Sequence, residues 1–222
     1  EIAATTALSF AKVNSITMEL QSIGLISETG KTDSNGGRPS ALYQIYPDFA
    51  FAIGCELSHK KVSTIVVDLT GKIISRHSAS FEIKEGKEAL IAKILAGIEL
   101  ELEKSGFPRE KFIDIGIAVA GLVNPQDGTS TPFPHLADWG NIALKEIIEK
   151  EFDLYCYVEN VANAAALAEL NYGFNRKIDN ILALNVGSGL GMGIILDGQL
   201  YKGVTGSAGE FGHITVDENG PL

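Results

Sequence analysis

Residues 187–191 read Gly-Ser-Gly-Leu-Gly, a type of loop whose backbone amides can approach and bind a phosphate group. The version that binds dinucleotides joins a strand to a helix, and the N-terminus of that helix holds the phosphate. Here the loop stands between two apolar runs, 180–186 and 192–196, and both are typical of strands. This disfavours a dinucleotide-binding fold. Two interpretations stay open: a plain hairpin turn whose glycines adopt positive φ, or a β-turn that faces a phosphate.

A second glycine pair occurs in the Gly-Gly-Arg-Pro sequence at 36–39. The two glycines let the backbone approach a surface closely, and Pro39 stiffens the exit from the loop. Arg38 is a residue type that enters a narrow minor groove of DNA. Strand-like runs at 25–28 and 41–46 flank this loop, so the segment is typical of the wing of a winged helix. The alternative is an ordinary hairpin.

An amphipathic helix is predicted just before this wing, with Ser9 as its N-cap and Gly24 as its end. Its apolar positions recur at helical spacing and are Leu8, Val13, Ile16, Leu20 and Ile23. Residues 1–6 fit the end of an earlier short helix. We therefore predict a winged helix-turn-helix over residues 1–48 that lacks a helix normally found before its start.

The residues expected to contact operator DNA lie on this helix and in the wing. Ser9, Lys12 and Asn14 would reach the major groove. Arg38 would enter the minor groove, while Phe10 faces either the major groove or the protein core. The formal net charge of the whole chain is -10, but local charge counts for more than the total. Residues 1–48 hold three basic side chains against five acidic ones, which argues against strong DNA binding by this segment.

From residue 49 onward the pattern becomes that of an α/β fold. Strands are predicted at 52–56, 62–68, 73–81, 113–120, 154–159, 180–186 and 192–196. Helices are predicted at 89–104, 142–151 and 163–172. Hairpin-connected strands open each half, in the manner of a duplicated fold. We place one subdomain at 49–175 and a second, C-terminally incomplete one at 176–222.

Composition is that of a globular protein with a sizeable core. The 222 residues are 45% hydrophobic and have a mean hydropathy of +0.13. No apolar run approaches the ~20 residues that a bilayer crossing needs, and the N-terminus lacks a signal pattern, so we expect a cytoplasmic protein without a membrane partner. Cys55 and Cys156 each lie in an apolar, strand-like run, where free thiols are expected.

Five ordered motifs together resemble the ROK family, which contains bacterial sugar kinases and sugar-responsive transcriptional repressors. The matching stretches are 120–124, 159–169, 185–193, 197–203 and 209–213, preceded by the winged-helix-like residues 8–39. The resemblance implies an actin-like, ribonuclease-H-like α/β fold. It is closest in kind to the transcriptional-regulator branch with its xylose- and N-acetylglucosamine-type repressors.

Departures from the family's kinases bear on the function that this resemblance implies. The kinases carry an Asp-x-Gly-Gly-Thr type of loop at the first phosphate site, whereas Glu56, Ser58 and His59 fill that space here. The kinases also use an Asp as general base on the sugar hydroxyl, and Val161 stands at that position. An aliphatic side chain accepts no proton, which removes a contribution of ~10²- to 10⁴-fold to the rate. We therefore expect no enzyme activity.

The first and second phosphate loops would both be vestigial. The second consists of Gly187, Ser188, Gly189 and Gly191.

The sugar-binding positions that the resemblance implies match the family more closely than the phosphate-site and base positions do. Asn160, Glu210 and His213 match residues that hydrogen-bond sugar hydroxyls in the family, and they offer the donors and acceptors that a polyhydroxylated ligand needs. His135 lies in a loop that resembles another edge of the sugar cleft. Each of the first three has an ordinary alternative role: Asn160 as a helix cap, Glu210 as an exposed turn acid, and His213 as a histidine with satisfied hydrogen bonds.

Zinc is the metal that the resemblance implies for the intact family member. There the histidine of the Gly-His motif joins three cysteines that follow it, and a tetrahedral site needs all four donors. This sequence ends at Leu222 before such cysteines, and Cys55 and Cys156 lie too far away to replace them. We expect no zinc or other cofactor in this stretch, although His213 is a candidate zinc ligand in an intact protein.

The predicted mechanism is binding of a sugar or sugar derivative in the cleft between the two actin-like halves. Closure of the halves would move the DNA-binding heads of a homodimer and alter operator affinity without chemistry on the ligand. Two alternatives stay open. One is a divergent ATP-dependent sugar kinase that uses the glycine hairpin, and the other is a sugar sensor that acts through a protein partner and has a degenerate DNA head.

Overall fold

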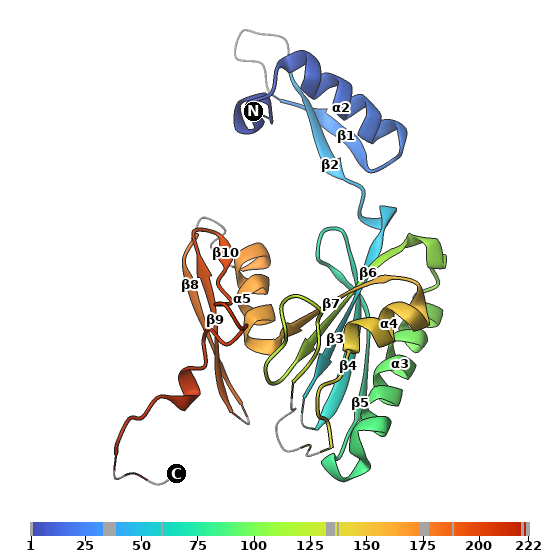
Figure 1. The fold of residues 1–222 in the computed structure, drawn as a ribbon. Coiled ribbons are helices and arrows are strands. Elements are labelled where there is room, and N and C mark those ends of the chain that lie inside the picture. The colour runs from blue at the N-terminus through green and yellow to red at the C-terminus, as the bar shows by residue number, and fades with distance from the viewer. Residues whose placement is uncertain are drawn as a thin grey trace.

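The computed structural model is an α/β structure of three parts, arranged as Figure 1 shows. It describes residues 2–32, 39–58, 60–131, 136, 138–173, 178–187, 189–218 and 220. We call residues 2–46 the head, residues 51–160 the first lobe and residues 161–213 the second lobe. Four residues singled out from the sequence, Arg38, His59, His135 and Ser188, lie outside the described residues.

The head consists of two helices and a hairpin: α1 (Ile2–Thr6), α2 (Phe10–Ser22), β1 (Ile26–Lys31) and β2 (Ala41–Ile45). Both predicted ends of the main helix are confirmed. The Ser9 side chain accepts a hydrogen bond from the Lys12 amide at 3.2 Å, which satisfies a donor that the first helical turn leaves open. Gly24 ends the helix with φ of +80°, and its amide donates to the carbonyl of Gln21.

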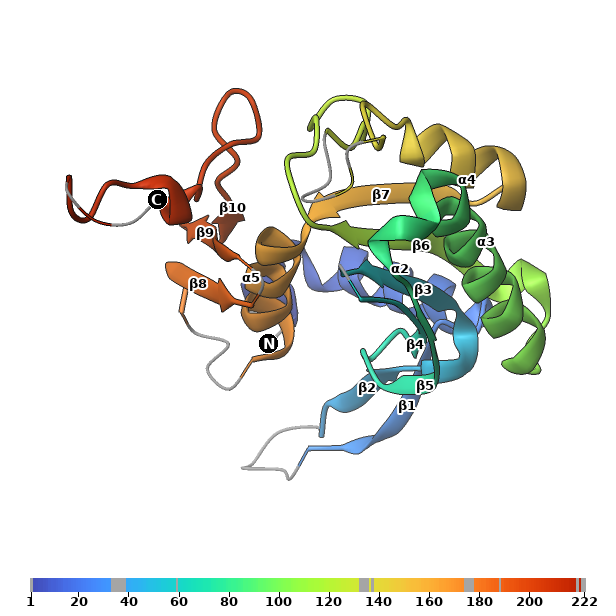
Figure 2. The same cartoon turned by 90° about the horizontal axis from the view of Figure 1, so that it is seen from below.

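A five-stranded sheet forms the centre of the first lobe, in the order β5-β4-β3-β6-β7. Its strands are β3 (Phe51–Leu57), β4 (Lys61–Asp68), β5 (Ile73–Ser80), β6 (Phe112–Val119) and β7 (Tyr155–Asn160). The first three form the predicted antiparallel meander, and β6 and β7 continue the sheet in parallel. The helices α3 (Gly86–Lys104) and α4 (Leu144–Phe152) cover one face (Figures 1 and 2).

The core of the first lobe lies between this sheet and its two helices. Alternate residues of a strand point to opposite faces, so Phe51, Ile53, Cys55 and Leu57 of β3 all turn inward and are buried. Leu90, Ile94 and Ile98 supply the matching stripe from α3. The face that carries Ala52, Gly54 and Glu56 is turned away from these helices.

The second lobe is a three-stranded sheet with one long helix against it. Its elements are α5 (Val161–Tyr172), β8 (Ile181–Val186), β9 (Leu190–Leu196), β10 (Gln199–Leu200) and the short 3₁₀ helix η4 (Phe211–His213). The sheet order is β10-β9-β8, all antiparallel. Figure 2 shows α5 between the two sheets, packed on β8 and β9. No helix among the described residues has the length and apolarity to span a membrane.

The glycine-rich loop connects β8 to β9, as the sequence predicts for a hairpin. Its neighbours Gly191 and Gly193 face α5, and a Cβ atom on Gly193 would lie 2.3 Å from the carbonyl oxygen of Ala162. By contrast, a Cβ atom on Gly189 would meet no atom of the described residues within 4 Å. At least one glycine of this hairpin is therefore required for the close approach of a helix to a sheet, independently of any phosphate.

Substituting Gly193→Ala is expected to lower the free energy of unfolding by about 2 kcal/mol or more, because backbone atoms cannot move aside as a flexible side chain would. The matched control is Gly189→Ala in the same hairpin, which adds the same methyl group without a neighbour and should be close to neutral. Urea denaturation of both variants measures the difference. Equal stability of the two variants would contradict this packing.

The two cysteines are free and buried, as expected from the sequence. Cys55 lies in β3 and Cys156 in β7, and burial raises the pKa of each thiol to about 12. Nearby carboxylates, Glu56 for Cys55 and Glu149 for Cys156, act in the same direction. Since the reactive species is the thiolate, both thiols should be inert in the folded chain.

We expect neither cysteine to react with a disulfide reagent at pH 8 in the native chain and both to react after denaturation. An unfolded thiol ionises near pH 8.5, whereas the folded thiols stay protonated up to about 12. The contribution of the protonated thiols to the free energy of unfolding is therefore fully present below pH 8.5. It is lost as the pH rises from 8.5 towards 12, because the unfolded chain releases these protons first. Rapid labelling of the native chain at pH 8 would show that the thiols are accessible.

Candidate ligand site between the lobes

The first lobe passes directly into the second at Asn160, where β7 ends and α5 begins. The side-chain oxygen of Asn160 accepts hydrogen bonds from the amides of Ala162 at 2.7 Å and Asn163 at 3.4 Å. Its side-chain nitrogen donates to the carbonyl of Gly121 at 2.8 Å. Asn160 is therefore the N-cap of α5, one of the two roles open from the sequence, and it also ties the helix to the first lobe.

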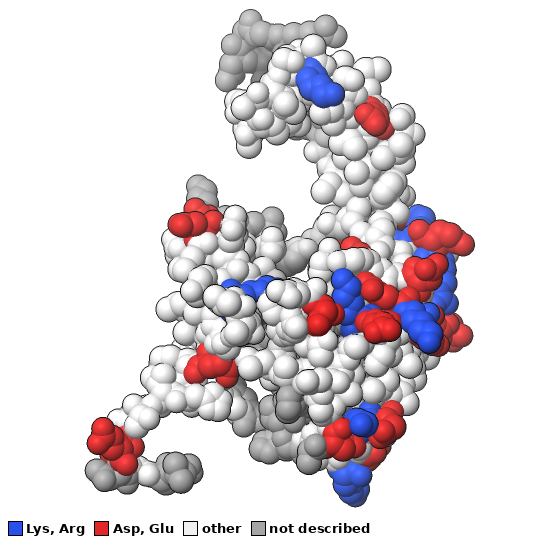
Figure 3. Space-filling model, in the orientation of Figure 1, with Lys and Arg blue, Asp and Glu red and all other residues white. Residues whose placement is uncertain are grey.

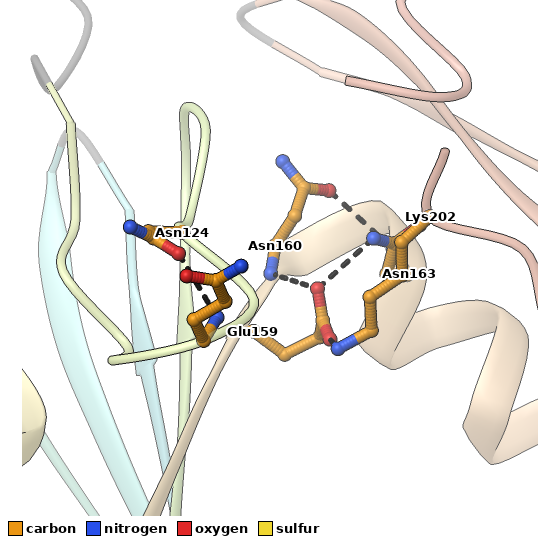
Figure 4. A network of polar contacts seen from close by, with 6 residues as sticks. Asn124, Glu159, Asn160, Asn163 and Lys202 are labelled. Atoms are coloured by element: carbon orange, nitrogen blue, oxygen red, sulfur yellow. Dashed lines mark hydrogen bonds and ion pairs between the residues drawn. The ribbon is translucent and has the colours of Figure 1, made fainter. Parts of the chain in front are cut away.

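Glu159 forms a polar network beside this cap (Figure 4). One carboxylate oxygen accepts hydrogen bonds from the Asn160 amide and from the Asn163 side chain, each at 2.9 Å. The other oxygen forms an ion pair with the Lys202 ammonium at 2.5 Å. Glu159 lies in β7 of the first lobe, and Lys202 lies in the loop after β10 of the second lobe. The ion pair therefore joins the two lobes.

Sequence reasoning missed Lys202. The stretch 197–203 is identified from the sequence only by its resemblance to a family motif, and a single lysine there gives no sign of which carboxylate it will meet. Glu159 stands far away in the sequence, and only the packing of α5 on β8 and β9 brings the two side chains together.

A pocket with a volume of about 360 Å³ lies next to this network, between the lobes. Its described lining residues are Glu56, Ala118, Val161, Ala164, Ala165, Leu184 and Asn185. Glu56 is the one charged side chain among them. The structure thus brings together Glu56 and Val161, two of the positions at which the sequence departs from a kinase, although they come from opposite lobes.

The chemistry of this pocket is poorly matched to a nucleotide polyphosphate. The described lining residues include no Lys or Arg that could bind phosphate oxygens. Val161 offers no lone pair to accept a proton. Ser58, the other described member of the first loop, closes the β3–β4 turn, with its hydroxyl bonded within the turn to Lys61.

Glu210 and His213 lie together at η4, which contacts β9. The carboxylate of Glu210 is 3.6 Å from the Nε2 atom of His213, whose side chain is 84% exposed. Among the described residues, no hydrogen bond or ion pair joins either side chain to Asn160. The structure therefore pairs two of the three expected sugar contacts, and it engages the third in the cap of α5.

The described residues offer no complete metal site. No group of three or more His, Cys, Asp or Glu side chains in the described part of the chain is arranged to hold a metal ion. Cys55 and Cys156 are buried in the first-lobe sheet, so they cannot join His213 on its exposed turn. The donors present do not fit a tetrahedral zinc ion.

The residues expected to meet DNA occupy different environments in the head. Lys12 and Asn14 are exposed on α2, while Ser9 serves as the cap. Phe10 is 81% exposed, so of its two possible locations the core is excluded. Figure 3 shows few charged side chains on the visible face of the head and a dense mixture of both signs over the first lobe.

A second, larger hollow of about 470 Å³ runs along the C-terminal half of α5. Its described lining residues are Ala165, Ala168, Glu169, Tyr172 and Gly173. Neither Glu56 nor Val161 is among these residues, whereas both line the smaller pocket. Because Val161 directly follows Asn160 in the chain, we take the smaller pocket as the candidate ligand site.

Two lobes, each with a sheet and packed helices and with a polar network where they join, define the α/β architecture of actin-like sugar kinases and their relatives. The sequence matches the ROK family over residues 52–222, and the chain belongs to this family.

The similarity to individual proteins extends over different parts of the chain. A xylose repressor from Caldicellulosiruptor bescii is 36% identical over 95% of this chain and 52% of its own length. A ROK family transcriptional regulator, a homologue of the E. coli MLC protein, superimposes with a TM-score of 0.80 over 99% of this chain and 55% of its own, at 29% identity. A ROK family glucokinase from Streptomyces griseus, solved with glucose and AMPPNP, superimposes with a TM-score of 0.69 over 77% of this chain and 52% of its own, at 33% identity. The chain spans about half the length of these relatives.

Removing the amide of Asn160 should weaken the junction of the lobes. We expect Asn160→Ala to cost about 1–2 kcal/mol of stability, because both the cap and the bond to Gly121 are lost. Asn160→Ser should cost less, since a serine hydroxyl can still accept from the helix amides. The control is Asn171→Ala near the other end of α5, where the amide bonds only within the exposed surface of its own helix. Equal losses for Asn160→Ala and Asn171→Ala in thermal unfolding would argue against the cap.

Proposed function

We propose that this protein is a sugar-responsive transcriptional regulator, most simply a repressor, that binds its ligand without catalysis. The carrying observation is the extent of the similarity. The xylose repressor and the ROK regulator match 95% and 99% of the chain, including the head. The glucokinase matches 77%, as expected for a kinase without the first 48 residues, about a fifth of this chain.

The pocket between the lobes supports a binding role over a catalytic one. Phosphoryl transfer depends on positive groups and metal ions that gather the phosphates, and on a positioned base. In this chain Glu56 and Val161 occupy that region. A neutral, polyhydroxylated ligand meets no such penalty, because it needs hydrogen-bonding groups and apolar contact surface rather than positive charge.

In the mechanism that we propose, a sugar enters between the lobes and is held by Asn160, Glu210 and His213, with His135 at the edge of the cleft. Glu210 and His213 reach the ligand only if the lobes close on it, since they lie on η4 of the second lobe. Ligand binding would then favour the closed arrangement by the difference in affinity between the two states. The vestigial phosphate loops at 56–59 and 187–191 would have no part in this.

DNA binding would reside in residues 1–48, proposed as a winged helix-turn-helix. The exposed side chains of Lys12 and Asn14 on α2 are available to the major groove, with Arg38 proposed for the minor groove. Because the segment carries few basic residues, one head alone would bind weakly. A homodimer that presents two heads to two half-sites of an operator would supply the affinity, and lobe closure would change the spacing of the heads.

A thermal-shift screen of neutral hexoses, pentoses and N-acetylated amino sugars, each with and without ATP and Mg²⁺, tests this proposal. A ligand at one hundred times its Kd should stabilise the chain by about 2.7 kcal/mol. We expect one class of sugar to give a shift that ATP and Mg²⁺ leave unchanged.

A shift with ATP and Mg²⁺ that grows when sugar is added, together with sugar-dependent ATP hydrolysis, would instead establish a kinase. A sugar shift without operator binding by an intact dimer would favour a sensor that acts through a protein partner. If no sugar stabilises the chain, the proposed ligand class is wrong.

A further inference from the structure

Described contacts link the two lobes both near the covalent crossover at Asn160 and at the far end of α5. The Lys202–Glu159 ion pair is one of them. A Cβ atom on Gly206 would lie 2.6 Å from the carbonyl oxygen of Val123, so the loop after β10 also rests on the first lobe. At the far end of α5, the Tyr172 ring covers Gly71 in the β4–β5 turn. The ion pair is the charged contact among these three.

Glu159 contacts residues on both sides of this crossover and can therefore couple the positions of the two lobes. Its side chain is only 17% exposed, so solvent screens its charge less than that of a surface carboxylate. One oxygen is occupied by the Asn160 amide and the Asn163 side chain, and the other by Lys202. The carboxylate thus holds the last residue of β7, the first turn of α5 and the loop after β10 in one arrangement.

We propose that Lys202 is a positioning residue that holds the two lobes in register through Glu159, and that it thereby keeps Asn160 oriented for a ligand. Asn160 contacts both lobes at once, because its nitrogen donates to Gly121 while its oxygen accepts from the start of α5. A shift of the loop that carries Lys202 would displace the Glu159 carboxylate through the ion pair. The Asn160 backbone amide, which donates to the same carboxylate, would then move as well.

If the proposed function is right, the Lys202–Glu159 ion pair and sugar binding at Asn160 influence each other. A sugar oxygen can accept from the second side-chain N–H of Asn160, whose first N–H is bound to Gly121. A sugar hydroxyl that donates to the Asn160 oxygen would share that oxygen with the amides of α5 and so change the balance between the lobes. By linkage, if sugar binding changes the strength of the Lys202–Glu159 pair by some factor, removal of the pair changes the sugar affinity by the same factor. A residue outside the expected sugar contacts would in this way set the response of the regulator.

Hydrogen exchange followed by mass spectrometry tests the positioning role directly in the full chain. The amides of Ala162 and Asn163, which donate to Asn160, report on the junction. We expect Lys202→Gln to speed their exchange about tenfold. The matched control is Lys93→Gln, which breaks an ion pair of similar exposure to Glu85 within the first lobe and should leave these amides unchanged. Equal exchange in Lys202→Gln and the wild-type chain would overturn the proposal, as would the same increase in both variants.

The conservative variant Lys202→Arg provides a second arm, because it keeps the positive charge and leaves the hydrogen bonds that Glu159 accepts from Asn160 and Asn163 in place. If the ion pair is what matters, Lys202→Arg should keep most of the protection that Lys202→Gln loses, and a loss as large as that of Lys202→Gln would count against it. Sugar binding is measured separately by calorimetry with the sugar from the thermal screen. A wild-type chain that binds no sugar but shows the expected exchange pattern would refute the proposed function while leaving the positioning role intact.

Discussion

The start of α5 at the end of β7 is the constraint on which the rest of the molecule depends. A helix must satisfy the amides of its first turn, and Asn160 does so while its other end is bound to the first lobe. The helix that packs against β8 and β9 is therefore anchored to the strand that completes the five-stranded sheet. The direction in which the second lobe leaves the first follows from this one residue and from the carboxylate next to it.

A fold of this kind separates binding from catalysis. The frame that brings two lobes together around a pocket depends on buried strands, capped helices and close helix–sheet packing, and all of these are present. Phosphoryl transfer depends on a few groups inside the pocket, where Val161 has no lone pair that could accept a proton. The chain resembles both regulators and a glucokinase over most of its lobes, so the same architecture serves both kinds of protein.

Much of the fold can be predicted from the sequence because its signals are local. The cap at Ser9, the end of the helix at Gly24, the meander after residue 50 and the hairpin around the glycine loop are all confirmed. Each depends on residues only a few positions apart. The predicted role of the glycines was incomplete, because Gly193 is required by a carbonyl of Ala162, and nothing in the local pattern reveals that neighbour.

The helices and strands, the free cysteines and the aliphatic residue at position 161 can all be inferred from the sequence. Three features emerge from the packing of the lobes: Glu159 pairs with Lys202, Glu56 and Val161 line one pocket, and Asn160 is bound to both lobes. The physical reason is the range of the forces involved. Helix caps and turns are set by neighbouring residues, whereas an ion pair between lobes depends on how two sheets and the helix between them pack.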